Sequence, residues 1–157
     1  MTEFDNDENA GRKLFKTYFS KYFKTLWFAD DRYSWFDCSG ETRTHKTLFE
    51  IKNRQRYRVA DWTGSTYIEK HKRDKFREFY EENRDFDLIY ICFYKDGWVS
   101  FDVNNRIKAT TSEWLATYVK YLPSTTSINT GYREKEVAEL RYNNNDYNDK
   151  IGYYESS

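Results

Sequence analysis

The residues from Leu88 to Phe93 form the most strongly apolar run of the chain, and they constrain its fold more than any other segment. The run consists of aliphatic and aromatic residues with one cysteine and has the length of a strand, so it predicts a strand at the centre of a sheet. Lys95-Asp96-Gly97 follows and carries the Asp-Gly signal for a tight hairpin. We therefore expect Trp98 to Phe101 to return as a second strand beside the first.

Helices are expected on both sides of this hairpin. Residues 12–28 place apolar side chains in two adjacent rows four residues apart, which predicts a helix. Residues 68–82 show a second helical pattern with a basic outer face. Thr110 with Glu113 matches a capping box for a short third helix that ends at the only proline, and residues 133–142 are expected to form a last helix.

Further strands are expected at residues 33–38 and 47–52, which would form a hairpin, and residues 54–59 alternate like an extension or another strand. The expected order is helix, strand hairpin, strand, helix, strand hairpin and a helical C-terminus. This order indicates an α/β sandwich with a mixed central sheet flanked by helices.

The length of 157 residues suits one domain with its own core, and an aromatic content of 20% can bury large areas. We expect that domain to span residues 11–142. Residues 1–10 form an acidic N-terminal segment, with four acids and no base. Residues 143–157 are rich in Asn and poor in apolar residues, so they are predicted to be a flexible tail.

Two carboxylates and one ammonium are predicted to meet in the first hairpin. Glu50 and Lys52 are two residues apart in a predicted strand, so they share one face, and Ile51 points to the other face. If residues 35–52 form a hairpin with its tip near Arg43, Asp37 lies across from Glu50, with the side chains roughly 5 Å apart. Two carboxylates that close can share a cation.

These residue types suit metal-dependent hydrolysis. Mg²⁺ takes hard oxygen ligands and is usually held by one or two carboxylates and a substrate phosphate, which fits Asp37 and Glu50. A lysine beside the metal orients or deprotonates the attacking water and offsets negative charge in the transition state, which fits Lys52. The alternative is a solvated surface strand, since an acid-x-Lys match arises by chance and needs context.

The formal net charge is zero, but the charge is unevenly distributed along the sequence. The stretch between Lys52 and Arg77 holds nine Lys and Arg against three acids, an excess of six beside the candidate metal residues. A nuclease needs positive charge near the scissile phosphate and can stay neutral elsewhere. An ordinary basic helix face is the competing interpretation.

The two cysteines and the absence of long apolar stretches bear on the compartment. Cys38 and Cys92 lack metal-binding spacing and are expected to be reduced and structural. His45 and His71 have no partner at metal-ligand spacing, so neither receives a role. Reduced cysteines indicate a cytoplasmic protein, and since no apolar stretch approaches the length of a membrane span, we expect no membrane contact.

Several short motifs together resemble the PD-(D/E)XK nuclease superfamily, especially its small phage and mobile-element members. The motifs are Trp35-Phe36-Asp37, Phe49-Glu50-Ile51-Lys52-Asn53-Arg54 and Tyr67-Ile68-Glu69-Lys70-x-Lys72, the last of which opens a helix. The strands that end at Asp102 follow them. The resemblance covers about half of the chain. It implies a restriction-endonuclease-like α/β sandwich and a host-cytoplasmic location if a phage encodes the protein.

The resemblance also implies residue roles. Asp37, Glu50 and Lys52 would be catalytic, and Mg²⁺ or Mn²⁺ would be held at Asp37, Glu50 and Ile51. Arg54, Lys70 and Lys72 would bind nucleic acid. The expected activity is endonucleolytic hydrolysis of DNA phosphodiester bonds.

Two features depart from the family pattern. Phe36 stands where a proline often precedes the aspartate, and the helix expected over residues 12–28 contains no acid, which leaves Glu3 and Glu8 as upstream candidates for a third ligand. A non-catalytic nuclease-fold protein that binds nucleic acid or a protein partner is therefore the alternative. A small aromatic scaffold is a third reading, and the sequence leaves the oligomeric state open, a homodimer included.

Overall fold

The computed structural model describes residues 3–30, 34–110, 114–123 and 132–154. It contains a six-stranded mixed sheet in the order β1-β2-β3-β5-β6-β9 and a three-stranded antiparallel sheet in the order β4-β8-β7. The protein is therefore a mixed α/β fold. The larger sheet comprises β1 (Thr25–Phe28), β2 (Cys38–Glu41), β3 (Lys46–Arg54), β5 (Phe86–Tyr94), β6 (Gly97–Asp102) and β9 (Lys150–Tyr153).

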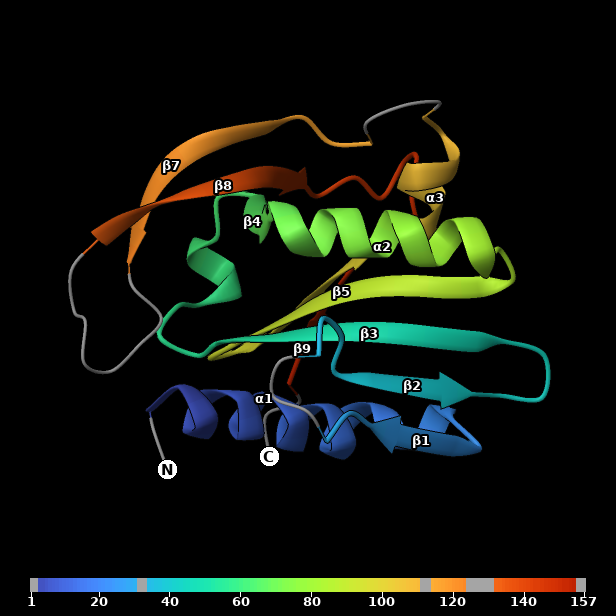
Figure 1. Ribbon diagram of the computed structural model, residues 1–157. Coiled ribbons are helices and arrows are strands. Elements are labelled where there is room, and N and C mark those ends of the chain that lie inside the picture. The colour runs from blue at the N-terminus through green and yellow to red at the C-terminus, as the bar shows by residue number, and fades with distance from the viewer. Residues whose placement is uncertain (1–2, 31–33, 111–113, 124–131, 155–157) are drawn as a thin grey trace.

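The smaller sheet comprises β4 (Ser65–Glu69), β7 (Thr117–Pro123) and β8 (Tyr132–Arg141), and the helices are α1 (Glu3–Phe19), α2 (Lys70–Glu82) and α3 (Val103–Lys108). Two short 3-10 turns cover Ser20–Tyr22 and Val59–Asp61. Helices α1 and α2 lie on either side of β3 and β5, and β7 and β8 lie beyond α2 (Figure 1).

The parallel pairing of β3 with β5 explains the position of α2. Parallel neighbours cannot be joined by a tight turn, so the chain needs a crossover connection, and β4 with α2 supplies it. All other pairs of the larger sheet are antiparallel. The predicted central strand is confirmed as β5, an interior strand, and the Asp-Gly hairpin into β6 is confirmed as well.

The two faces of β3 pack against different layers, as the two-residue side-chain period requires. Phe49 and Ile51 belong to the apolar cluster that contains Phe15 of α1. Leu48 belongs to the cluster that contains Phe76 of α2. Glu50 and Lys52 share the face of Leu48, so they point away from α1.

The first helix differs from its prediction at both ends. It begins at Glu3, inside the acidic segment, and ends at Phe19, so the expected domain boundary after residue 10 falls within a helix. Residues 25–28, expected to be helical, form β1 and pair with β2. The dense apolar sequence fits a strand period of two as well as a helical period of 3.6. Pairing with β2 selects the strand, in which Leu26 and Phe28 pack inward while Thr25 and Trp27 face outward.

One glycine makes this pairing possible. Gly40 of β2 lies opposite Leu26, and a Cβ atom at this position would come within 2.6 Å of the Phe23 ring. The aromatic residue just before β1 therefore packs directly on the β2 backbone. This close approach is a tertiary constraint that the helical pattern of residues 12–28 does not contain.

The C-terminal third departs most from the expectation. The helix expected over residues 133–142 is wrong, because residues 133–141 lie in β8, which pairs with β4 and β7 on its two sides. The third helix expected from Thr110 is wrong over Thr117–Pro123, which is β7, while Glu113 of its capping box lies outside the described residues. Alternating Lys and Glu in β8 gave no apolar period by which to distinguish a strand from a helix.

The expected flexible tail is also corrected as far as Tyr154. Strand β9 pairs with β6, and Asp149 is fully buried. The Asp149 carboxylate accepts hydrogen bonds from the Arg106 guanidinium at 2.7 and 2.6 Å and from the N–H groups of Asp102 and Asn143. Polar contacts, rather than apolar ones, therefore hold this segment, and composition alone does not reveal them.

Candidate metal and nucleic-acid site

The candidate site lies where β2 and β3 separate. Their pairing ends at Cys38 and Phe49, whereas β3 continues along β5 to Arg54. Asp37 immediately precedes β2, donates its N–H to Phe49 O at 2.9 Å and accepts from Ala29 N at 2.9 Å. Of the strand expected at residues 33–38, only Cys38 belongs to β2, and residue 33 lies outside the described residues.

The Asp37 carboxylate is buried at this fork. Its Oδ2 accepts from Ile51 N at 2.7 Å, and its Oδ1 accepts from Arg12 Nε at 3.2 Å. The Ile51 N–H is available because β2 no longer pairs with β3 at that point. In a strand, the N–H and C=O of one residue point to the same side, so the Ile51 carbonyl also faces the fork.

Helix α1 brings a third carboxylate to Asp37. Arg12 donates to Ala29 O at 2.8 Å and to Glu8 Oε1 at 3.4 Å, so it links Glu8 and Asp37. Burial and then the charge of Asp37 raise the pKa of Glu8, and the two carboxyl groups also share a hydrogen bond. The expectation that the first helix has no acid is therefore wrong, because the helix begins before Glu8; the side chain of Glu3 lies outside the described residues.

Glu50 is the most confined carboxylate of the site, with 3% of its surface exposed. Its Oε1 accepts from Lys72 Nζ at 2.6 Å and lies 3.7 Å from Lys52 Nζ. Its Oε2 is buried and, among the described side chains, is the one such atom without a hydrogen-bond partner. Burial raises the pKa of Glu50 to about 7, although the nearby Lys72 and Lys52 charges lower it and Asp37 raises it further.

The two lysines differ in their readiness to lose a proton. Burial and the neighbouring Lys72 charge lower the pKa of Lys52, although Glu50 opposes this effect. Burial also acts to lower the pKa of Lys72, but Glu50 outweighs it and raises the pKa of this group. Lys52 is therefore the better proton acceptor, and Lys72 is the fixed cation.

The carboxylates of Asp37 and Glu50 are held from different layers. Asp37 is bound by Arg12 of α1, and Glu50 is bound by Lys72 of α2. They still interact electrostatically, because the charge of Asp37 raises the pKa of Glu50. The site is thus the opening of the sheet between α1 and α2, rather than one flat strand face.

The three predicted phosphate-binding residues lie in different environments. Lys72 contacts Glu50 instead of the open surface. Lys70 pairs with Asp74 at 3.3 Å on the first turn of α2. Arg54 is half-buried at the end of β3.

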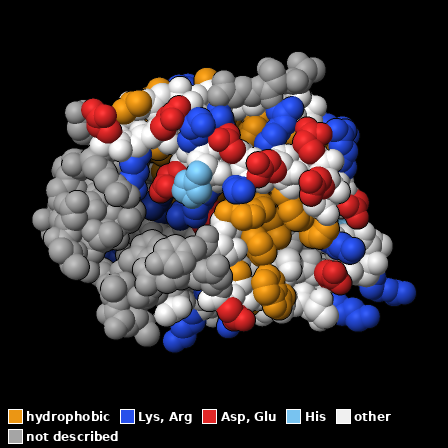
Figure 2. Space-filling view, viewed as in Figure 1, with side chains coloured by type: hydrophobic (Ala, Val, Ile, Leu, Met, Phe, Trp, Pro, Cys, Tyr) orange, Lys and Arg blue, Asp and Glu red, His pale blue; other side chains and the backbone are white. Residues whose placement is uncertain are grey.

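A hollow of about 390 Å³ lies at Lys70 and is lined in part by β8, a strand that no sequence pattern connects with the site. It is lined by the start of α2 and by β8 (Glu69, Lys70, His71, Asp74, Glu134, Lys135 and Glu136). Figure 2 shows basic side chains receding into a hollow on this face.

Glu69 connects the hollow to the candidate site. Its burial acts to raise its pKa, but Lys135, Lys52 and Lys72 lower it overall. Lys135 lies 3.5 Å from Glu69 and reaches the hollow only because residues 133–142 form a strand. The spacing between Glu69 and Lys135 gave no signal for this contact.

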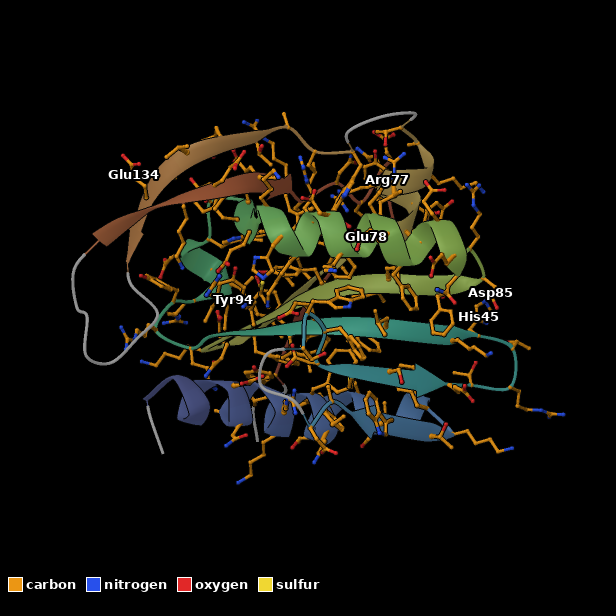
Figure 3. The ribbon with its side chains drawn as sticks, viewed as in Figure 1. His45, Arg77, Glu78, Asp85, Tyr94 and Glu134 are labelled. Atoms are coloured by element: carbon orange, nitrogen blue, oxygen red, sulfur yellow. The ribbon has the colours of Figure 1, made fainter. Side chains whose placement is uncertain are left out.

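The remaining candidate side chains lie elsewhere or are inert. Figure 3 shows His45 next to Asp85, at the end of the sheet opposite the start of α2. Cys38 and Cys92 are free and buried, and burial raises the pKa of both thiols.

Within residues 3–30, 34–110, 114–123 and 132–154, no three or more His, Cys, Asp and Glu side chains are grouped as a metal site. Over the same residues, no helix is long and apolar enough to cross a membrane. No protein-family model matches the chain, and no curated protein matches it in sequence.

Proposed function

We propose that the protein is a Mg²⁺- or Mn²⁺-dependent deoxyribonuclease with a restriction-endonuclease-like fold. The observation that carries this proposal is the Glu50 carboxylate, which is buried, feels the Asp37 charge, and keeps one oxygen without a hydrogen-bond partner among the described residues. Leaving a buried carboxylate oxygen unpaired is costly, and a hard cation at this oxygen would remove the cost. Magnesium needs only one or two carboxylates when phosphate and water complete its octahedron.

The donor set around the fork suits such a cation. Asp37 and Glu50 supply carboxylate oxygens, the Ile51 carbonyl supplies a neutral oxygen, and Glu8 lies next to Asp37 as a further acid. A bound Mg²⁺ or Mn²⁺ would lower the pKa of a coordinated water and stabilise charge on the phosphate. Asp37 Oδ1 would exchange its hydrogen bond from Arg12 Nε for the cation, while Oδ2 keeps its hydrogen bond from Ile51 N.

The lysines would divide the remaining work. Lys52, with its lowered pKa, orients the attacking water and accepts its proton. Lys72 remains an ammonium and stabilises negative charge on the non-bridging phosphate oxygens. Arg54 and Lys70 contact flanking phosphates, where each acts through charge rather than base recognition.

Cleavage of plasmid and branched DNA with Mn²⁺ tests this proposal. Lys52→Ala should lower the rate by about 100-fold or more, because it removes the proton acceptor. Lys150→Ala is the matched control, since Lys150 is an exposed lysine on β9 at the far edge of the same sheet. Equal metal-dependent rates in wild type and Lys52→Ala would refute the assignment.

One observation favours a second candidate function, a non-catalytic nuclease-fold protein that binds nucleic acid or a protein partner. Lys72 Nζ lies 2.6 Å from Glu50 Oε1 and already supplies a cation to this carboxylate. If the ammonium replaces a metal permanently, the protein will bind no Mn²⁺ at Glu50. Metal binding to the isolated protein therefore distinguishes the two functions.

A further inference from the structure

A row of aromatic side chains runs along the same side of the larger sheet as Glu50. The ring centroids of Trp27 and Phe36 are 6.0 Å apart, and those of Phe36 and Trp35 are 5.4 Å apart. Trp35 continues to Phe79 of α2 at 5.9 Å, and Phe79 contacts Phe86 at 5.0 Å. We call these five residues the aromatic row.

The two ends of the row differ in their burial. Trp35, Phe79 and Phe86 pack on the core beneath α2. Trp27 is 55% exposed, although it lies on a strand of the sheet. Its exposure has a simple cause: β1 is an edge strand, and Leu26 and Phe28 already supply its contacts to the α1 side.

The strand register places Trp27 on the face of the candidate site. Trp27 pairs with Ser39, and Ser39 pairs with Leu48, which shares its face of β3 with Glu50. Ala29, two residues along the chain from Trp27, bonds to the Asp37 backbone. Trp27 therefore lies roughly 7 Å along the strand from the level of Asp37.

Phe36 extends this surface to the candidate site itself, since it directly precedes Asp37. Figure 2 shows an apolar patch below α2 on the same face of the molecule as the hollow with basic side chains. At the other end of the row, Lys46 Nζ lies 5.7 Å from the centre of the Phe86 ring. The surface thus combines one exposed aromatic ring, Trp27, and four partly buried rings with a cation, Lys46, at its margin.

We propose that the aromatic row, through its exposed end at Trp27, stacks the bases of single-stranded nucleic acid, so that substrates with unpaired bases are preferred at the site. This inference rests on the proposed function for its link to cleavage. Outside the basic stretch between Lys52 and Arg77 the chain is net negative, so the part that carries Trp27 gains little from non-specific attraction to the duplex backbone. Stacking on aromatic rings supplies affinity without net charge, and only unpaired bases expose the faces it requires.

Fluorescence anisotropy with a labelled 12-nucleotide single strand and the corresponding duplex, both in EDTA, tests the row without cleavage. The wild-type protein should bind the single strand more tightly. Trp27→Ala should weaken this binding roughly 5- to 100-fold and leave duplex binding unchanged. Tyr153→Ala is the matched control, because Tyr153 is 57% exposed on β9, the opposite edge strand, and it should retain wild-type affinity.

The outcomes separate the row from the cleavage chemistry. Because metal is absent, single-strand binding that depends on Trp27 supports the inference even if the Mn²⁺ cleavage assay fails. Equal affinity for the two DNA forms, or equal losses in Trp27→Ala and Tyr153→Ala, overturns it. A Trp27-dependent change in the mass of the protein by light scattering, without a change in DNA affinity, also overturns it and identifies the row as a protein interface.

Discussion

Two buried carboxylates, Asp149 and Glu50, differ in how completely their oxygens are hydrogen-bonded. Asp149 accepts four hydrogen bonds on its two oxygens, two of them from the Arg106 guanidinium. Glu50 receives two ammonium groups at Oε1, whereas its Oε2 has no partner among the described residues. A satisfied carboxylate holds two segments together, and an unsatisfied one retains the capacity to bind a cation.

The positions of the two carboxylates support this distinction. Asp149 joins the segment before β9 to α3, far from the fork between β2 and β3. Glu50 lies on β3 next to that fork, where the Asp37 charge raises its pKa. Buried polar groups without partners are rare in folded proteins, and they concentrate where function requires them.

The largest expected difference between the two carboxylates concerns stability. Asp149→Ala leaves the buried Arg106 guanidinium without its partner and should lower the free energy of unfolding by about 3–5 kcal/mol. Glu50→Ala should change it far less, on the order of 1 kcal/mol, because burial already disfavours the Glu50 charge. Urea unfolding at neutral pH measures both variants, and Asp149→Asn provides a milder change if the alanine variant does not fold.

Similar losses in Glu50→Ala and Asp149→Ala would contradict the comparison. They would mean that the Glu50 cluster, like Arg106 with Asp149, mainly stabilises the fold. The two lysines that Glu50→Ala leaves behind retain some contact with solvent, since 25% of the Lys52 side chain and 14% of the Lys72 side chain are exposed.

The second difference concerns pH. The pKa of Glu50 is raised from 4.5 to about 7, so between these values the folded protein keeps a proton that the unfolded chain has lost. This group therefore stabilises the fold less as the pH rises through that range, by up to about 3 kcal/mol. Urea unfolding of wild type and Glu50→Gln from pH 4.5 to 7 isolates the contribution, because other titrating groups are common to both proteins.

In that series, the stability of Glu50→Gln relative to wild type should increase with pH. A constant difference between the two proteins would show that Glu50 has an ordinary pKa. In that case Glu50 would not be the confined carboxylate that the comparison requires.

The smallest expected effect concerns the cluster around Asp149. The Arg106 guanidinium lies 4.4 Å from the centre of the Tyr147 ring, in a cation–π contact. Tyr147→Leu keeps an apolar side chain but removes this contact, and it should cost about 0.5–1 kcal/mol in thermal or urea unfolding. No loss in this variant would mean that hydrogen bonds alone account for the stability of the Arg106 cluster.

The sequence predicted those parts of the fold in which a local pattern had one interpretation. Glu50 and Lys52 were correctly placed on one strand face because the side-chain period of a strand is two. Helix α2 and the hairpin at Gly97 were also found, since basic amphipathic and Asp-Gly patterns are specific. The helix predictions for residues 25–28 and 133–142 were wrong because the residue patterns there fit a helix as well as a strand. Pairing with neighbouring strands selects the strand.

The candidate site was less predictable than the strand that carries it. The predicted first helix does not include Glu8, because the acidic residues 3–8 lack the apolar period by which the helix start at Glu3 could be recognised. The proximity of Lys72 to Glu50 depends on the packing of α2 over β3, which no spacing in the sequence encodes. The Arg106–Asp149 pair joins residues 43 positions apart in a segment whose composition resembles a flexible tail.

Calorimetric titration of the protein with Mn²⁺ at pH 7.5 tests the central claim most directly, namely that the open oxygen of Glu50 is part of a metal site. Glu50→Gln removes the carboxylate charge, and Glu78→Gln, on the outer side of α2 (Figure 3), is the matched control. The account predicts one Mn²⁺ site in wild type and Glu78→Gln that is lost in Glu50→Gln. Equal Mn²⁺ binding in all three proteins, or none in any of them, would contradict it.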